Sequence, residues 1–351
     1  MADVATLTSR VDRLRASLEE PLLVTNGPNV FYLVGFRSTN AALLVEPDRA
    51  RLFTDFRYRD QASTVEGVEV VVTERSLLRG IAKHVSGRVG FEATTLTYAE
   101  WDALRTAGLE LVPRVGAVER LRAVKDDNEV ATMREACEIT DRVYAAMAEE
   151  RFVGRTEREL AWRMEQLFHE HGADAVAFPI IVGSGPTGAL PHGRATERVV
   201  DANTTVVIDA GCYVDGYASD CTRTFATGEL PDDLARAYEV CRQAQQAGLG
   251  ATRVGVSGRD ADAASRVPIG EADWGEYYGH GLGHGVGILV HESPVLRPES
   301  EDVLEPGNVV TVEPGIYFPG RAGIRIEVLV VVTEEGNDVL TGFTKELVLV
   351  R

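Results

Sequence analysis

Lysine is scarce in this chain, and acidic residues clearly outnumber basic ones. Only three of its 36 basic residues are lysines, while 54 acidic residues bring the formal net charge to −18 and the pI to about 4.9. Because binding to a phosphate backbone requires a basic surface, this composition disfavours a nucleic-acid-binding protein. It favours a surface adapted to high salt (a halophilic protein), with an ordinary acidic protein from a GC-rich bacterial or archaeal genome as the alternative.

The chain also lacks long apolar runs. No run approaches the roughly 20 residues that span a bilayer. Residues 1–15 have no unbroken apolar stretch of the kind that secretory signals carry, so we expect a cytoplasmic protein. The cysteines form no C-x-x-C pair, which predicts reduced, buried thiols. They are Cys137, Cys212, Cys221 and Cys241.

Two common catalytic motifs are absent as well. No G-x-S-x-G sequence is present, which argues against a serine hydrolase with a nucleophile elbow. None of the lysines lies in a G-x-x-x-x-G-K sequence, which argues against a P-loop enzyme.

The length of 351 residues allows two domains, and the sequence texture changes near residue 124. Before that point, strand-like runs alternate with helical patterns, which predicts an α/β domain over residues 1–123. The predicted strands are 22–25, 41–45, 51–54 and 69–72, and the predicted helices are 10–20, 77–84 and 98–106.

The second predicted domain, residues 124–351, has long helices followed by β-rich sequence. A β region opens at 178–182, and the sequence after the last predicted helix is rich in strands and glycine, so we expect the α+β class. Thr156 and Glu159 lie in capping-box register at the start of one helix. The predicted helices are 126–150, 156–171 and 231–246.

An internal repeat in this domain carries acidic residues at matching positions. The sequence VIDAGCY at 207–213 matches VTVEPGIY at 310–317 when Asp209 is aligned with Glu313, and a glycine follows at the same offset in both. Each copy continues into a second strand with another acid, Asp220 in the first and Glu327 in the second. Two hairpins with an acid on each arm predict duplicated αβ halves about a pseudo-twofold axis.

The four acids and a glycine-rich segment together point to metal ions. Carboxylates in apolar strands are costly to bury unless they are paired, hydrogen-bonded or bound to metal. The alternating glycines of 279–287 (GHGLGHGVG) exclude a helix and suit an extended chain with His280 and His284 on one face. Four carboxylates and one imidazole are too oxygen-rich for a lone zinc, whereas two divalent ions match their charge. The alternatives to a metal site are ordinary acids that face solvent and a flexible loop whose histidines have no role.

These motifs resemble a known family. In chain order, VIDAG, SDCTRTF, GHGLGHGVGI, VHESP, TVEPGIY and GIRIE resemble the proline-specific metallopeptidases of the pita-bread (creatinase/prolidase/aminopeptidase P) family, namely prolidase and aminopeptidase P. The sequences NVFYLVGF (29–36) and TDFRY (54–58) are similar to the creatinase/prolidase N-terminal domain, so the resemblance covers nearly the whole chain. It implies a pita-bread catalytic domain preceded by a smaller α/β domain.

The resemblance implies an activity and its cofactors. The reaction is hydrolysis of the Xaa-Pro bond, in dipeptides or at peptide N-termini, by a hydroxide that bridges two divalent metal ions. Mn²⁺ or Co²⁺ are implied first, with Zn²⁺ or Fe²⁺ as alternatives, and a homodimer is the expected assembly. The implied metal ligands are Asp209, Asp220, His284, Glu313 and Glu327.

Further residues carry over by the same resemblance. Glu313 is implied to guide the proton of the attacking water, and His291 to stabilise the oxyanion. His192 and His280 are implied to contact or approach the substrate, and Arg325 to fix a carboxylate or a proton relay. Phe178 offers an apolar wall for the substrate proline, with core packing as the alternative.

Two positions depart from the family pattern. Val328 stands where an aspartate often follows the last ligand, and Val295 stands where dipeptide-clamping prolidases often carry arginine. The second departure weakens the expectation of strict dipeptidase activity. The alternatives are a creatinase-like amidinohydrolase, a methionine aminopeptidase-like enzyme and a non-catalytic binding module.

Overall fold

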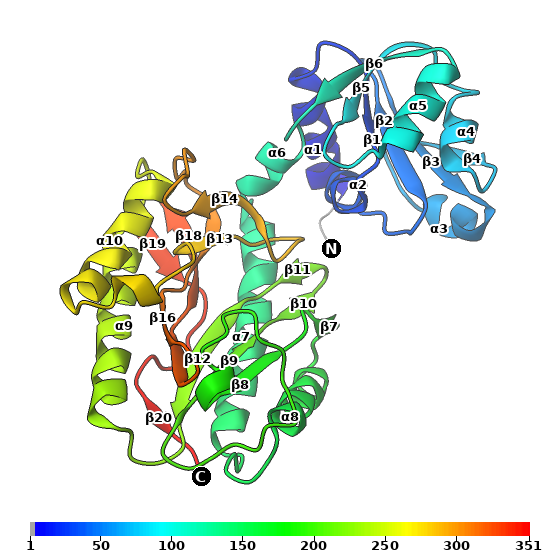
Figure 1. Cartoon of the computed structure of the whole chain (residues 1–351). Coiled ribbons are helices and arrows are strands. Elements are labelled where there is room, and N and C mark those ends of the chain that lie inside the picture. Colours follow the sequence, from blue (N-terminus) through cyan, green and yellow to red (C-terminus); the bar gives the residue numbers. More distant parts are fainter. Residues whose placement is uncertain (1–3) are drawn as a thin grey trace. The chain divides into compact units, whose positions relative to one another are not determined.

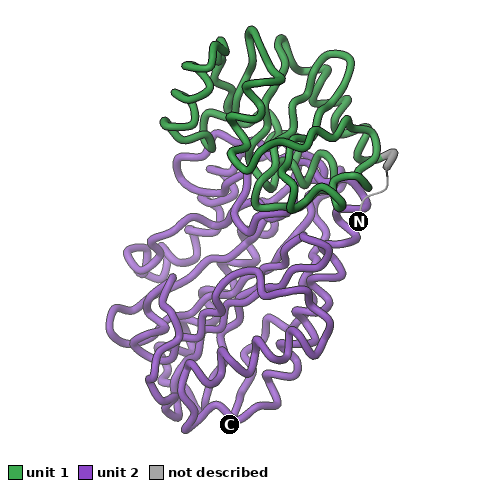
Figure 2. The backbone as a smooth tube through the Cα atoms, turned by 90° about the vertical axis from the view of Figure 1, so that its right-hand side faces the viewer, with its two compact units in different colours: residues 1–122 green, residues 123–351 purple. Residues whose placement is uncertain are grey.

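The computed structural model describes residues 4–351. Its chain forms two compact units that divide between Arg122 and Ala123, within the short helix α6 (Glu119–Ala123) (Figure 2). None of the described helices is both long enough and apolar enough to cross a membrane.

The first unit is built on one six-stranded mixed sheet with the order β4-β3-β2-β1-β5-β6. The β1/β2 and β2/β3 pairs are antiparallel, and the other three pairs are parallel. The strands are β1 (Leu22–Val24), β2 (Ala41–Val45), β3 (Ala50–Asp55), β4 (Glu69–Thr73), β5 (Gly87–Glu92) and β6 (Leu109–Arg114). The predicted α/β class is therefore confirmed.

The helices of this unit differ from the predicted ones at several ends. The predicted helix 10–20 runs instead over α1 (Val4–Ala16), because Ser17 and Leu18 turn back onto the carbonyls of Leu14 and Arg15. The predicted helix 77–84 is shortened to α4 (Leu77–Ile81), while α5 (Tyr98–Thr106) has the predicted bounds. The sequence patterns missed α2 (Gly27–Val34) and α3 (Arg59–Ala62).

The second unit contains two helix pairs, each packed on its own strands (Figure 1). The first pair is α7 (Asp127–Ala148) and α8 (Glu157–Glu170), and both begin with a capping box, the second being the predicted pair Thr156 and Glu159. The second pair is α9 (Asp232–Ala251) and α10 (Gly258–Glu271). The helix α10 was not predicted, because Gly258, Pro268 and Gly270 obscure its periodicity.

Both helix pairs are followed by a long antiparallel ladder that continues into a short hairpin. In the first half, β9 (Thr205–Ala210) pairs with β12 (Cys221–Ala226), and β10 (Cys212–Val214) pairs with β11 (Tyr217–Ala218). In the second half, β15 (Val309–Val312) pairs with β18 (Val328–Thr333), and β16 (Gly315–Phe318) pairs with β17 (Ala322–Arg325). The repeat in the sequence is thus a repeat of structure. The remaining strands are β7 (Ala175–Val176), β8 (Ile181–Ser184), β13 (Gly283–Gly285), β14 (Glu292–Leu296), β19 (Gly336–Val339) and β20 (Val348–Leu349).

The glycine-rich segment is extended only over β13 and bends on either side of it. Its glycines are required by close backbone packing, since a Cβ at Gly283 would lie 2.0 Å from the carbonyl oxygen of Thr311, and one at Gly285 would lie 2.3 Å from that of Ser293. This packing seats His284, between the two glycines, against the strand β15.

Candidate metal centre

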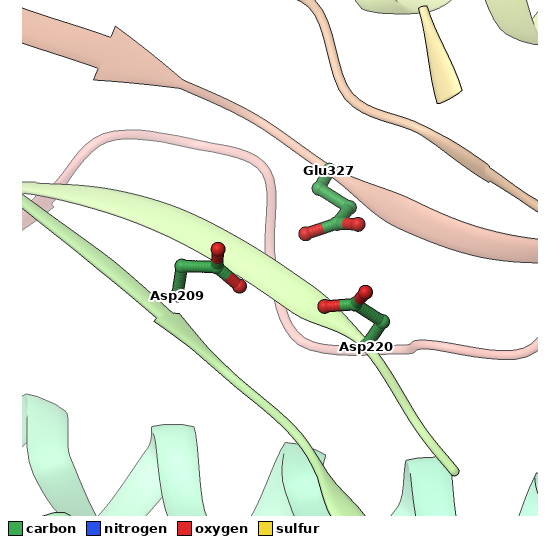
Figure 3. A group of neighbouring side chains, drawn as sticks. All are labelled: Asp209, Asp220 and Glu327. Carbon is green, nitrogen blue, oxygen red and sulfur yellow. The ribbon is translucent and has the colours of Figure 1, made fainter. Parts of the chain in front are cut away.

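Three carboxylates from both halves of the second unit meet at one point. Asp209 lies near the end of β9, Asp220 directly precedes β12, and Glu327 lies between β17 and β18. One oxygen of each lies within 4.8 Å of the others, and Figure 3 shows the three groups facing one another. Asp220 and Glu327 are buried and Asp209 is half-buried, so this is not a solvated acidic patch.

Hydrogen bonds to neighbouring strands hold these carboxylates in place. Thr222, which is paired with Asp209 across the β9/β12 ladder, donates its hydroxyl to Glu327 Oε2 at 2.8 Å. The buried hydroxyl of Tyr144 on α7 lies 3.0 Å from the carbonyl oxygen of Ile208 and 2.6 Å from that of Cys221. The residues next to Asp209 and Asp220 are therefore fixed to the same helix.

His284 and Glu313 extend the cluster. The Nε2 atom of His284 lies 3.3 Å from Glu313 Oε1 and 3.8 Å from Asp220 Oδ2. Its Nδ1 lies 3.1 Å from the carbonyl oxygen of Gly285, which accepts the ring proton and leaves Nε2 for the acids. Thr311 donates to the same Oε1 of Glu313 at 3.1 Å. The five side chains named as ligands thus form one connected group.

The electrostatics of the carboxylates favour a bound cation. Burial and the charges of neighbouring acids raise the pKa values of Asp220 and Glu327 well above the usual range, and burial also raises that of Asp209. Among the described residues, the buried Oδ1 of Asp209 has no hydrogen-bond partner. Divalent cations would satisfy this oxygen and neutralise the crowded charge, so the residues present fit a metal centre.

The pKa values of His284 and Glu313 shift so that both groups are charged, unlike those of the three crowded acids. Burial opposes charge on His284, but its contact with Glu313 outweighs burial and raises the pKa of the imidazole to about 9. Burial likewise opposes charge on Glu313, but His284 lowers the pKa of that carboxyl to about 2. A cation at this position therefore competes with a proton for the Nε2 atom of His284.

Arg325 is a buried arginine that connects the centre to its surroundings. Its Nη2 lies 2.7 Å from Asp209 Oδ2, and its Nε donates to Thr222 Oγ1 at 2.9 Å. Its Nη1 lies 2.9 Å from the hydroxyl of Tyr317 and 3.1 Å from the carbonyl oxygen of Pro191. The guanidinium therefore holds one oxygen of Asp209 and leaves the other for a cation.

Of the remaining candidate residues, two contact the cluster or its surroundings, namely His291 beside His284 and His280 beside Tyr317. The ring centroid of His291 is 4.2 Å from that of His284, and the Nε2 of His280 lies 2.9 Å from the hydroxyl of Tyr317. His192 is exposed. Burial lowers the pKa values of both His280 and His291. Phe178 is half-buried at the start of the β8 region, and its role in substrate binding stays a prediction.

The two departures from the family pattern have different surroundings. Val328 is fully buried, is paired with Val312 and belongs to the apolar core beneath α10. Val295 is half-buried on β14 and is paired with His284 across the β13/β14 ladder. A charged side chain is thus absent from both positions, one in the core and one beside the centre.

Three residues that organise the centre were not predicted from the sequence, namely Tyr144, Thr222 and Tyr317. Thr222 could have been found, because it alternates with Asp220 along a strand and therefore shares its face. Tyr317 lies in the repeated motif itself. Tyr144 gave no signal beyond its apolar periodicity, since its partners are 64 and 77 residues away.

Comparisons with known proteins identify the family of this chain. Residues 131–334 match metallopeptidase family M24, and residues 10–124 match the creatinase/prolidase N-terminal domain. A Xaa-Pro dipeptidase of Pyrococcus horikoshii is 33% identical over 337 residues, which cover 94% of each chain. The pita-bread fold expected from the resemblance is confirmed by solved structures of this kind.

Two of those solved structures differ in how similar they are to this chain. A Xaa-Pro dipeptidase from Bacillus anthracis superposes with a TM-score of 0.95 at 40% identity, covering 98% of this chain and 99% of that one. An X-Pro aminopeptidase from Thermotoga maritima superposes with a TM-score of 0.89 at 31% identity, covering 97% of this chain and all of that one. With its carboxylate cluster, its duplicated halves and these matches along nearly its whole length, the chain belongs to metallopeptidase family M24.

Proposed function

We propose that this metallopeptidase holds two metal ions and hydrolyses the bond between an N-terminal residue and proline, in Xaa-Pro dipeptides or at the N-termini of longer peptides. The observation that carries the proposal is the connected group of Asp209, Asp220, His284, Glu313 and Glu327, which comes from both halves of one unit. The relatives named as Xaa-Pro dipeptidase and X-Pro aminopeptidase support the substrate class.

Those five residues would hold the ions, with Mn²⁺ or Co²⁺ as the first candidates and Zn²⁺ or Fe²⁺ as alternatives. When bound, two divalent ions supply Lewis acidity and lower the pKa of water to near neutrality. The unpartnered Oδ1 of Asp209 and the Nε2 of His284 are the atoms whose surroundings most clearly call for a cation.

The protein's own groups would handle the proton and the developing charge. Glu313 is ionised in the free protein, so it is ready to take a proton from the attacking water and to return it to the proline nitrogen. His291, stacked beside His284, would stabilise the negative charge that develops on the carbonyl oxygen. Arg325 opposes the effect of burial on the pKa of Asp209 and holds its carboxylate correctly turned.

Selectivity for proline would rest on shape, because an Xaa-Pro bond has no N–H group to donate. His192 and His280 are the proposed polar contacts to the substrate, and Phe178 is the proposed apolar wall for the proline ring. Val295 leaves no arginine at that position to clamp a dipeptide carboxylate, which favours acceptance of longer peptides.

A peptide assay with Mn²⁺ or Co²⁺ tests the function. We expect Ala-Pro or Ala-Pro-Ala to be hydrolysed with kcat/KM about 10²-fold above that of matched peptides with alanine in place of proline. Hydrolysis of the dipeptide alone would assign a dipeptidase, and hydrolysis of the tripeptide an aminopeptidase. Release of N-terminal methionine without a proline requirement would favour a methionine aminopeptidase-like enzyme. Hydrolysis of no peptide by the metal-loaded protein would favour a creatinase-like hydrolase or a binding module.

The acidic composition leads to a separate prediction about salt. We propose that the protein is a cytoplasmic homodimer that works in a salt-rich cell. If the net charge of −18 is an adaptation to salt, molar KCl will raise the melting temperature and the activity, because screening relieves the repulsion between carboxylates. Thermal unfolding, turnover and sedimentation at low and molar KCl measure stability, activity and dimer mass together. Equal values at both salt concentrations would mean that the protein is acidic without being halophilic.

A further inference from the structure

A buried carboxylate outside the metal centre, Glu157, has no part in the mechanism above. It lies in the first turn of α8, and its side chain is completely buried, with 0% exposure. Burial of a carboxylate is costly unless hydrogen bonds compensate it, so its partners show what the side chain is for.

Those partners come from the two ends of one segment, Ser184–Thr196. At the start, Glu157 Oε1 accepts from the backbone N–H of Ser184 at 2.8 Å, from the Ser184 hydroxyl at 2.9 Å and from the Thr187 hydroxyl. At the end, Glu157 Oε2 accepts from the backbone N–H of Thr196 at 3.0 Å and from its hydroxyl at 2.6 Å. Each oxygen therefore holds one end of the segment.

The middle of the same segment reaches the centre. The carbonyl oxygen of Pro191 accepts from Nη1 of Arg325, whose Nη2 holds Asp209. Gly188 is in backbone contact with β17, since a Cβ at Gly323 would lie 1.8 Å from the carbonyl oxygen of Gly188. His192 follows Pro191 directly, so the segment that carries it is fixed at its two ends and touches the second half at its middle.

We propose that Glu157 is a positioning residue that binds both ends of the segment Ser184–Thr196 and thereby holds His192 in place for substrate binding. This inference rests on the proposed function, because it takes His192 to contact the substrate. Hydrogen bonds from Thr187, Thr196 and Ser184 outweigh the effect of burial and lower the pKa of Glu157, so the carboxylate is ionised and accepts all five bonds. A glutamine would place an NH₂ donor against donors at one end and release that end.

Kinetics of Glu157→Gln test the inference. We expect KM for an Xaa-Pro peptide to rise about tenfold and kcat to change less than about threefold, because the metal ligands are untouched. Hydrogen exchange of the peptides covering 184–196 will become faster, and the rise in melting temperature on adding Mn²⁺ will remain. Thr196→Val should also raise KM, and Thr196→Ser, which keeps the hydroxyl, should restore it.

The matched control is Glu159→Gln, two residues further along α8. Glu159 accepts from the backbone N–H of Thr156 in the capping box of the same helix, and its side chain bonds to no residue of the segment in any described contact. An equal rise in KM in this control would show that helix stability is responsible, and would overturn the proposal.

Two further results would also overturn it. Faster exchange at 184–196 with an unchanged KM would mean that the segment is clamped by Glu157 but does not serve the substrate. If the wild-type protein hydrolyses no Xaa-Pro peptide, both the proposed function and this inference are wrong. The exchange data would still decide whether Glu157 holds the two ends of the segment. Should Glu157→Gln fail to fold, the Thr196 pair gives the same decision.

Discussion

Replacement of Glu313 by glutamine is expected to reduce kcat by about 10²–10⁴-fold, which is the range that a general acid–base group contributes. The pKa of Glu313 is lowered to about 2, so its side chain is an ionised carboxylate across the neutral range, whereas the amide of a glutamine cannot accept a proton in its place. The amide also keeps only one oxygen for a cation, so metal affinity should fall as well.

The fold should tolerate this substitution. The backbone N–H of Glu313 donates to the carbonyl oxygen of Leu282 at 2.8 Å, and this bond does not depend on the side chain. Steady-state kinetics and thermal unfolding of Glu313→Gln make the measurement, with Glu305→Gln, an exposed glutamate outside the centre, as the control. Turnover within about twofold of the wild type would contradict the role assigned to Glu313.

The second large effect is expected at Asp220, where stability and metal response should change in opposite directions. In the metal-free protein, burial and then the charges of Glu327 and Asp209 raise the pKa of Asp220 well above its usual range. The folded state then binds protons that the unfolded state releases, so the free energy of unfolding falls as pH rises above about 4. Asp220→Asn removes one such group and should raise the melting temperature of the metal-free protein at neutral pH by about 2–4 °C.

The same substitution should abolish the response to metal. Mn²⁺ at a hundred times its Kd is expected to stabilise the wild-type protein by about 2.7 kcal/mol, and Asp220→Asn should lose both this shift and the peptidase activity. Thermal unfolding with a chelator and with Mn²⁺ measures both effects. Asp215→Asn, at an exposed turn of the same hairpin, is the control and should respond like the wild type. A full metal response in Asp220→Asn would exclude Asp220 as a ligand.

Much of the catalytic unit was accessible from sequence because its information is local or repeated. The aligned motifs around Asp209 and Glu313 located the hairpins, and capping residues such as Thr156 marked helix starts. What escaped prediction depends on distant partners: the hydroxyl of Tyr144 resembles that of any core tyrosine until β9 and β12 lie beside it. Glu157 likewise reads as an ordinary acid in the first turn of a helix, although its partners lie 27–39 residues away.

The division of the five proposed ligands between the duplicated halves would have a mechanical consequence. Asp209 and Asp220 come from the first half, whereas His284, Glu313 and Glu327 come from the second. Any ion bound among them is a crosslink between two pieces of chain that are otherwise joined by ordinary packing and hydrogen bonds, such as that from Glu327 N–H to Thr222. The free energy of ion binding would therefore also hold the two halves together, and we expect chelation to loosen the contact between them at the place where the reaction would occur.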